Sequence, residues 1–278
     1  MHRYIRKLYY SIPPAGRFLL RRTYFLPHDL WAAIRGDGGT IRPPKGLIYT
    51  GGGDFIAHGE QALAYFRRHA GLLPRHQVLD VGSGIGRIAI PLTGYLDSSG
   101  SYEGFDVIRT GVDWCTRNIT ARHPNFLFRY VSLDNDLYRS DGGDAARFTF
   151  PYPDGRFDLV VVNSVFTHLV PEEAFRYLAE TFRVLRSGGA CYATFFLYDK
   201  DTVWSRDFPF PHDFGDYRLM DTQVRSANVA FRQDALLTRI RRMGFVVRRL
   251  SPGAWKGTEQ GVAEGFQDIL LLEKPEAV

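Results

Sequence analysis

The sequence predicts an α/β protein with a doubly wound, mainly parallel sheet, and three observations support this fold class. Strands and helices alternate from residue 77 onward in five β/α units. Short apolar runs between polar residues, such as 157–162 (FDLVVV), are typical of central strands buried on both faces. Two final strands flank a glycine-rich loop and form a hairpin, which predicts a reversed last strand.

The expected elements follow in a fixed order. Pro91 should kink or shorten the second helix. The helix that begins at Pro171 has Glu172 and Glu173 in its first turn and should end at Gly188-Gly189. The other expected helices are 58–73, 86–96, one marked by Val112, Cys115 and Ile119, and 233–243. The expected strands are 77–81, 101–107, 126–131, 157–162, 190–197, 245–250 and 268–272, with a polar and aromatic insertion at about 199–232.

Composition limits the class of protein. The 278 residues are 23% charged and 45% apolar, which is ordinary for one globular domain with a substantial core. No run of 18 apolar residues occurs, so no membrane span is expected. Cys115 and Cys191 are the only cysteines, so we expect two small buried residues, no disulfide framework and a reducing, cytoplasmic compartment. No dense Asp/Glu/His cluster occurs, so no metal site is expected.

Positive charge is concentrated at the N-terminus. Residues 1–49 contain nine Lys or Arg against Asp29 and Asp37, a balance of +7, whereas the remainder has a balance of −2. We therefore divide the chain into a basic extension with a Gly/Pro-rich joint (1–54) and a domain (55–278). The extension either lies at an anionic inner membrane surface or near an acidic substrate, or forms a helical lid with solvated arginines. The slightly acidic domain argues against a nucleic-acid partner.

The stretch 78–87 (VLDVGSGIGR) is the most informative motif. It predicts a buried strand that enters a tight turn at Gly82, Gly84 and Gly86 and then opens a helix. A ligand can lie against bare backbone in such a turn, although a turn without a ligand is the alternative. The third glycine comes one residue earlier than in the dinucleotide fingerprint, which argues against a nicotinamide-dependent oxidoreductase. Asp106 ends the next strand twenty residues later, where a carboxylate accepts hydrogen bonds from ribose hydroxyls.

These features resemble motif I of the class I S-adenosylmethionine (SAM) methyltransferases. The runs 150–169 (FPYPDGRFDLVVVNSVFTHL) and 183–189 (RVLRSGG, with Ser187 in place of the usual proline) are similar to later motifs of that family. The resemblance covers about 55–275 and implies a seven-stranded Rossmann-like sheet of order 3-2-1-4-5-7-6, with SAM as the cofactor. SVFTHL (164–169) and the pairing of GAW (253–255) with QDILL (267–271) resemble bacterial members associated with glycan and polysaccharide biosynthesis.

The resemblance also implies which residues bind the cofactor. After the third strand the family offers an acidic residue to the adenine amino group, and Asp134 and Asp144 compete for that place, with Asp134 favoured. The implied cofactor-binding residues are Asp80, Gly82, Ser83, Gly84, Gly86, Asp106, Val107, Asp134, Asn135 and Asn163.

The acceptor side has two candidate catalytic bases, His168 after the fourth strand and His212 in the insertion. His168 is favoured because it follows a rigid strand, although a structural histidine explains it equally well. Aromatic residues of the insertion and the last loop are expected to contact the acceptor or to form a small core: Phe208, Phe210, Phe214, Tyr217 and Trp255. The expected reaction is methyl transfer to a hydroxyl of a glycan or glycolipid precursor. The alternatives are methylation of a lipid-like or small aromatic metabolite, or SAM binding without catalysis.

Overall fold

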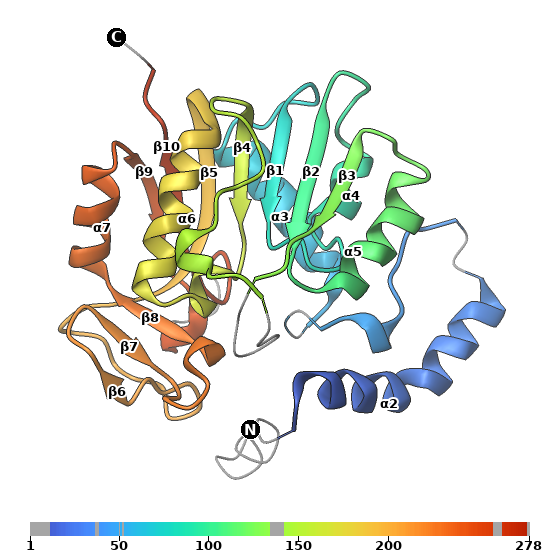
Figure 1. Ribbon diagram of the computed structural model, residues 1–278, viewed down its shortest axis with the longest axis horizontal. Coiled ribbons are helices and arrows are strands. Elements are labelled where there is room, and N and C mark those ends of the chain that lie inside the picture. Colours follow the sequence, from blue (N-terminus) through green and yellow to red (C-terminus); the bar gives the residue numbers. More distant parts are fainter. Residues whose placement is uncertain are drawn as a thin grey trace.

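The computed structural model describes residues 12–36, 39–49, 51, 53–133, 142–257 and 263–276 (Figure 1). Its centre is one twisted sheet with helices on both faces. The strands are β1 (Gln77–Val81), β2 (Ser101–Asp106), β3 (Phe126–Tyr130), β4 (Phe157–Val162), β5 (Leu185–Tyr198), β6 (His212–Asp213), β7 (Tyr217–Leu219), β8 (Val229–Arg232), β9 (Val246–Ser251) and β10 (Asp268–Glu273). The helices are α2 (Pro14–Arg35), α3 (Phe55–His69), α4 (Ala89–Thr93), α5 (Arg109–Cys115), α6 (Pro171–Val184) and α7 (Gln233–Arg242).

Among the described residues the sheet has ten strands, so the expected seven-stranded sheet is not confirmed. Strands β3, β2, β1, β4 and β5 pair in parallel in that order, β10 pairs antiparallel with β5, and β9 pairs antiparallel with β10. Three further strands come from the insertion: β8 pairs in parallel with the end of β5, and β7 and β6 follow it antiparallel. These strands are only two to four residues long and are defined by their distant partners, which is why local sequence did not reveal them.

The alternation of side chains along the central strands divides the core in two. Leu79 and Val160 face the side covered by α6 and α7. Val78 and Val161, their neighbours in the chain, face the side covered by α3, α4 and α5. All four side chains are fully buried, as expected for parallel strands covered on both faces.

Local sequence explains the start of α3 and the short length of α4, but it does not explain the end of α6. Asp54 accepts hydrogen bonds from the backbone N–H groups of Ile56 and Ala57 at 2.9 and 3.1 Å and starts α3. Helix α4 is only five residues long and contains Pro91, as its sequence predicts. The predicted end of α6 at Gly188-Gly189 is wrong, because Leu185 adopts an extended backbone and pairs with Phe157, so β5 begins directly after Val184.

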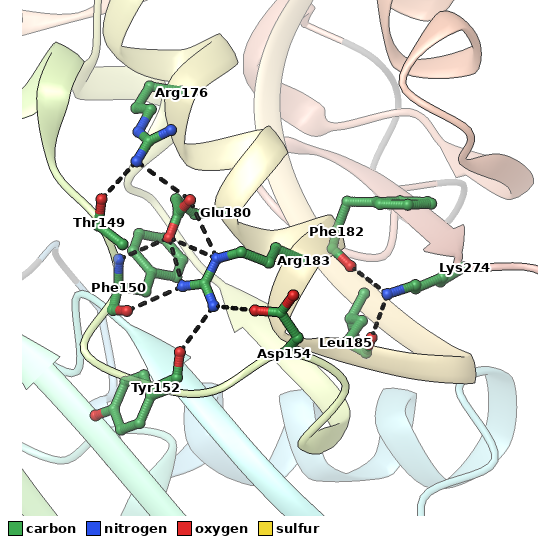
Figure 2. Close-up of polar contacts among 10 residues, drawn as sticks. All are labelled: Thr149, Phe150, Tyr152, Asp154, Arg176, Glu180, Phe182, Arg183, Leu185 and Lys274. Atoms are coloured by element: carbon green, nitrogen blue, oxygen red, sulfur yellow. Dashed lines mark hydrogen bonds and ion pairs between the residues drawn. The ribbon is translucent and has the colours of Figure 1, made fainter.

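The segment that leads into β4 is held against α6 by a charged network (Figure 2). The Arg183 guanidinium donates hydrogen bonds to the carbonyl oxygens of Phe150 and Tyr152 at 3.0 and 2.8 Å and pairs with Glu180 at 2.6 Å. Glu180 is buried and also accepts the N–H of Phe150 at 2.8 Å. Arg183, the first arginine of the RVLRSGG run, therefore has a structural role. It donates hydrogen bonds to backbone carbonyl groups of a segment that is not part of a strand.

Candidate active site

A cavity of about 530 Å³ lies where β1, β2 and β4 end. The carboxyl ends of parallel strands are the usual ligand-binding edge of such a sheet. Figure 1 shows that the insertion strands β6–β8 and helix α2 lie at this same edge. Eight of the predicted site residues line the cavity: Asp80, Gly82, Ser83, Gly84, Asp106, Val107, Asn163 and His168.

The glycine loop is closed by backbone hydrogen bonds. The N–H groups of Gly82 and Ser83 both donate to the carbonyl oxygen of Phe105, at 2.9 and 3.0 Å. Gly82 has a φ of 76° and Gly84 a φ of 58°, a backbone conformation that favours glycine. A Cβ atom on Gly82 would lie 2.4 Å from Cγ2 of Val165, so the loop approaches the β4 edge too closely for any side chain.

Gly86 has a different role from the other two glycines. It does not belong to the cavity lining. A Cβ atom there would lie 2.8 Å from Cδ1 of Ile119 and 3.1 Å from Sγ of Cys115. This glycine therefore allows the loop to pack against α5 and the turn after it.

Two buried carboxylates form part of the cavity wall. Asp106 accepts hydrogen bonds from the N–H groups of Gly84 and Ile108 at 2.8 and 2.7 Å. Burial nevertheless raises its pKa to about 6. Burial also raises the pKa of Asp80 to about 7, although the Tyr102 hydroxyl donates to it at 2.6 Å. Asp106 is mostly ionised at neutral pH, which suits the binding of hydroxyl or ammonium donors, whereas Asp80 is partly protonated there.

The two candidate partners of adenine, Asp134 and Asp144, both follow β3 in the chain. Asp134 and Asn135 lie outside the described residues. Asp144 is exposed, and its carboxylate accepts the N–H of Ala146 at 2.9 Å at the start of a short helical turn. Ala145 and Leu133 line the cavity beside it.

His168 lies on the short turn Phe166–His168 that follows β4. Its Nδ1 is 2.8 Å from the carbonyl oxygen of Ser226. Because a carbonyl oxygen only accepts, Nδ1 carries the proton and the neutral ring has its lone pair on Nε2. The insertion, through Ser226, therefore fixes the orientation of the His168 ring.

Sequence reasoning missed a polar network beside His168. Ser164 has a φ of 59°, the one described non-glycine residue in the left-handed region. Its N–H donates to Oγ1 of Thr194 at 2.7 Å, and both hydroxyls donate to Oε1 of Gln267, at 2.9 and 2.6 Å. Gln267 lines the cavity and begins the QDILL run. The strained backbone at Ser164 is stabilised by these contacts, and such strain is concentrated at functional sites.

The aromatic residues of the acceptor side divide into two groups. Phe208 lines the cavity together with Phe196 and Phe266, which were not predicted. Phe210 and Trp255 are buried in the small core behind them, and Nε1 of Trp255 donates to Asp268 at 2.7 Å.

Three predicted acceptor-side residues lie elsewhere. Phe214 and Tyr217 stack on each other beside α6 and α7, in a separate hollow. His212 is exposed on β6 and does not line the cavity, because the β6–β7 pair extends away from it.

Helix α2 also contributes to the cavity. Arg17, Phe18 and Arg21 line it, as does Tyr49 from the chain that follows. The rings of Phe18 and Tyr49 meet edge to face at 5.7 Å, and the Tyr49 hydroxyl is 3.5 Å from Oδ1 of Asp106. Local sequence patterns gave no sign of these contacts, because Phe18 is 31 residues from Tyr49 and Tyr49 is 57 residues from Asp106.

Comparison with known proteins is consistent with this geometry. Residues 79–193 match a family model described as a methyltransferase domain. A SAM-dependent methyltransferase from Methanosarcina mazei has a similar structure, with a TM-score of 0.51 and 18% identity over 74% of this chain and 95% of that one. The 1,6-didemethyltoxoflavin-N1-methyltransferase of Burkholderia thailandensis, solved with S-adenosylhomocysteine, has a TM-score of 0.50 and 15% identity over 95% and 92%. The cyclase SpnF has a TM-score of 0.51 and 20% identity over 78% and 80%.

The structural similarities show the fold, and the family model adds a match to a methyltransferase domain. Residues 79–193 match the methyltransferase-domain model, and the cofactor is S-adenosyl-L-methionine. The cavity fits this cofactor, because the glycine-loop backbone forms part of its wall and Asp106 offers a buried carboxylate beside it. No group of three or more His, Cys, Asp or Glu side chains that could hold a metal ion occurs among the described residues.

Proposed function

We propose that the protein transfers a methyl group from SAM to a hydroxyl of a glycan or glycolipid precursor. The observation that carries the proposal is His168, which lines the cavity with its Nδ1 proton held by the Ser226 carbonyl. When bound, the cofactor supplies an electrophilic methyl group on a sulfonium sulfur. Nε2 of His168 would accept the acceptor hydroxyl proton as the methyl carbon passes from the sulfonium sulfur to the hydroxyl oxygen, which leaves the methyl ether and S-adenosylhomocysteine.

The cofactor is held in this proposal by the ends of three strands. Asp106 accepts hydrogen bonds from the ribose hydroxyls, and the backbone of Gly82 and Gly84 passes beside the methionine portion. Asp80, Ser83, Val107 and Asn163 complete the wall, and Gly86 keeps the loop packed. Asp134 remains the proposed partner of adenine, with Asn135 beside it.

The acceptor side supports a ring-shaped substrate with hydroxyl groups. Phe196, Phe208 and Phe266 present an aromatic wall, and Gln267 and Asn228 add polar groups beside it. Aromatic faces pack on sugar rings, and a few placed polar groups fix orientation. The same wall suits a small aromatic or lipid-like metabolite, which is the second candidate. Two buried free cysteines and the basic N-terminus support a cytoplasmic reaction near the inner membrane surface.

Calorimetric titration with SAM, S-adenosylhomocysteine and NAD tests the cofactor part. We expect binding of the first two only, and Asp106→Asn should weaken it by about 1–3 kcal/mol, since charge-assisted hydrogen bonds are lost. Unchanged affinity in that variant would contradict the assigned role. Methyl transfer from labelled SAM to glycolipid extracts, compared with small phenols, separates the two acceptor classes.

A further inference from the structure

The outward face of α2 is apolar and exposed. Seven large apolar side chains, at spacings of one to four residues, form the apolar face of α2: Leu19, Leu20, Tyr24, Leu26, Leu30, Trp31 and Ile34. Each is between 52% and 85% exposed. They make up seven of the thirteen exposed large hydrophobic residues found among the described residues. Such a concentration on one helix indicates an interaction surface rather than scattered surface residues.

All the charged side chains of α2 except one are positive. Its cations are Arg17, Arg21, Arg22 and Arg35. Its single acid, Asp29, is turned toward the body, where it accepts the N–H groups of Lys45 and Gly46 at 2.8 and 2.9 Å. Arg35 stacks its guanidinium 3.8 Å above the ring of Trp31, on the apolar face itself. A helix with an apolar face and a basic rim is typical of segments that lie on an anionic membrane surface.

The opposite face of α2 belongs to the cavity. Arg17 is only 9% exposed, and it lines the cavity with Phe18 and Arg21. Phe18 contacts Tyr49, whose hydroxyl reaches Asp106. One helix therefore separates the cavity from the exposed apolar face, and a helix with its side chains is about 10–12 Å across.

We infer that α2 docks on an anionic membrane surface through its apolar face and forms the wall between that surface and the cavity. The membrane contact stands independently of the reaction. If α2 docks in this way, the methyl acceptor carries a lipid anchor and is methylated without leaving the membrane. This consequence rests on the proposed function. A second copy of the chain is the less suitable occupant, because two such helices would bring their basic rims together.

None of the described helices has the length and apolarity needed to cross a bilayer. Helix α2 would accordingly lie in the interface, with the exposed Arg22 and Arg35 near the lipid headgroups.

Trp31 offers a direct test in the full-length protein. It is the exposed one of the four tryptophans, since Trp114 and Trp255 are buried and Trp204 is half-buried. Vesicles of phosphatidylglycerol and phosphatidylcholine in equal parts should shift its emission to the blue and sediment with the protein. Phosphatidylcholine vesicles alone should bind much less, and added salt should weaken the anionic binding.

The double variant Leu30→Gln/Ile34→Gln should bind the anionic vesicles at least about tenfold more weakly, because it removes two inserted side chains. Leu127→Gln, at a comparably exposed site on β3, is the matched control and should bind as the unchanged protein does. Both variants should keep SAM affinity in solution.

Absent vesicle binding, or binding unaffected by the double variant, would overturn the inference while leaving the SAM titration intact. A dimer that the double variant dissociates, without vesicle binding, would assign the face to a second copy. If SAM fails to bind while vesicles do, the proposed function fails and the docking surface stands.

Discussion

At the scale of single residues, Gly84 is expected to have two roles. It adopts a left-handed backbone conformation, and it forms part of the wall of the cofactor site. Gly84 has a φ of 58° and lines the cavity, whereas Gly155 has a φ of 63° in an open turn where a Cβ would meet nothing within 4 Å. Alanine at either position should cost about 1–2 kcal/mol of folding free energy, because both backbones are left-handed. Only Gly84→Ala should also weaken SAM binding.

Thermal melts and calorimetric titration of this pair of variants separate the two effects. Equal loss of SAM affinity in Gly155→Ala would mean that the effect comes from general destabilisation, and unchanged affinity in Gly84→Ala would remove the loop from the cofactor site.

The two candidate histidines differ in what surrounds them. His168→Ala should lower turnover by about 10²–10⁴-fold and leave SAM affinity nearly unchanged, since it removes a base and no cofactor contact. His212→Ala should leave turnover unchanged, because that side chain is exposed on β6 and does not reach the cavity. Single-turnover rates and SAM titration should be measured together. A His168→Ala protein that loses stability but turns over normally when folded would show that the ring only supports the Ser226 backbone.

At the scale of elements, Arg183 joins α6 to the segment before β4. Arg183→Gln should lower the free energy of unfolding by about 2 kcal/mol, because Glu180 stays buried with fewer partners and two carbonyl groups lose their donor. Arg248→Gln is a matched control, since Arg248 is exposed and its ion pair with the half-buried Glu273 should contribute much less to stability. Urea unfolding of both variants checks this, and equal losses would contradict the structural role of Arg183.

Elements were predictable where local pattern decides them. The strands 77–81 and 157–162 have the expected bounds, because an unbroken apolar run between polar residues leaves little choice of register. The boundary between α6 and β5 was not predictable, since it depends on Leu185 pairing with Phe157 rather than on the glycines that follow. The short strands β6–β8 depend in the same way on a partner, β5, far from them in sequence.

At the scale of the whole molecule, the two buried carboxylates give stability a defined dependence on pH. The pKa values of Asp80 and Asp106 are about 7 and 6 in the folded protein, against an ordinary value of 3.8. The folded state therefore holds protons that the unfolded chain has released, and this contribution to stability is lost as pH rises from about 4 through 7. We expect Asp80→Asn to flatten the fall in unfolding free energy over this range, measured by urea unfolding at several pH values. An unaltered pH profile in Asp80→Asn would show that its carboxyl does not titrate in that range.

The site was predictable in its cofactor half and less so in its acceptor half. The glycine spacing and the acidic strand end identify residues close together in the chain, and the fold brings them to one edge. Arg17, Ser164 and Gln267 come from three distant segments, and only the assembled sheet edge shows that they share a cavity.

Strand β5 has a consequence for how such proteins diversify. Among the strand pairs of the described residues, the insertion joins the rest of the sheet through three pairs only, at Phe196, Leu197 and Tyr198. The glycine loop follows β1 and Asp106 ends β2, and both strands lie on the other side of β4 from β5. The 199–232 segment can therefore vary among proteins of this fold with little effect on the cofactor-binding half of the site. A protein with a different segment there could use a different methyl acceptor. Chimeras exchanged at Tyr198 and Gln233 would be the laboratory equivalent of that variation.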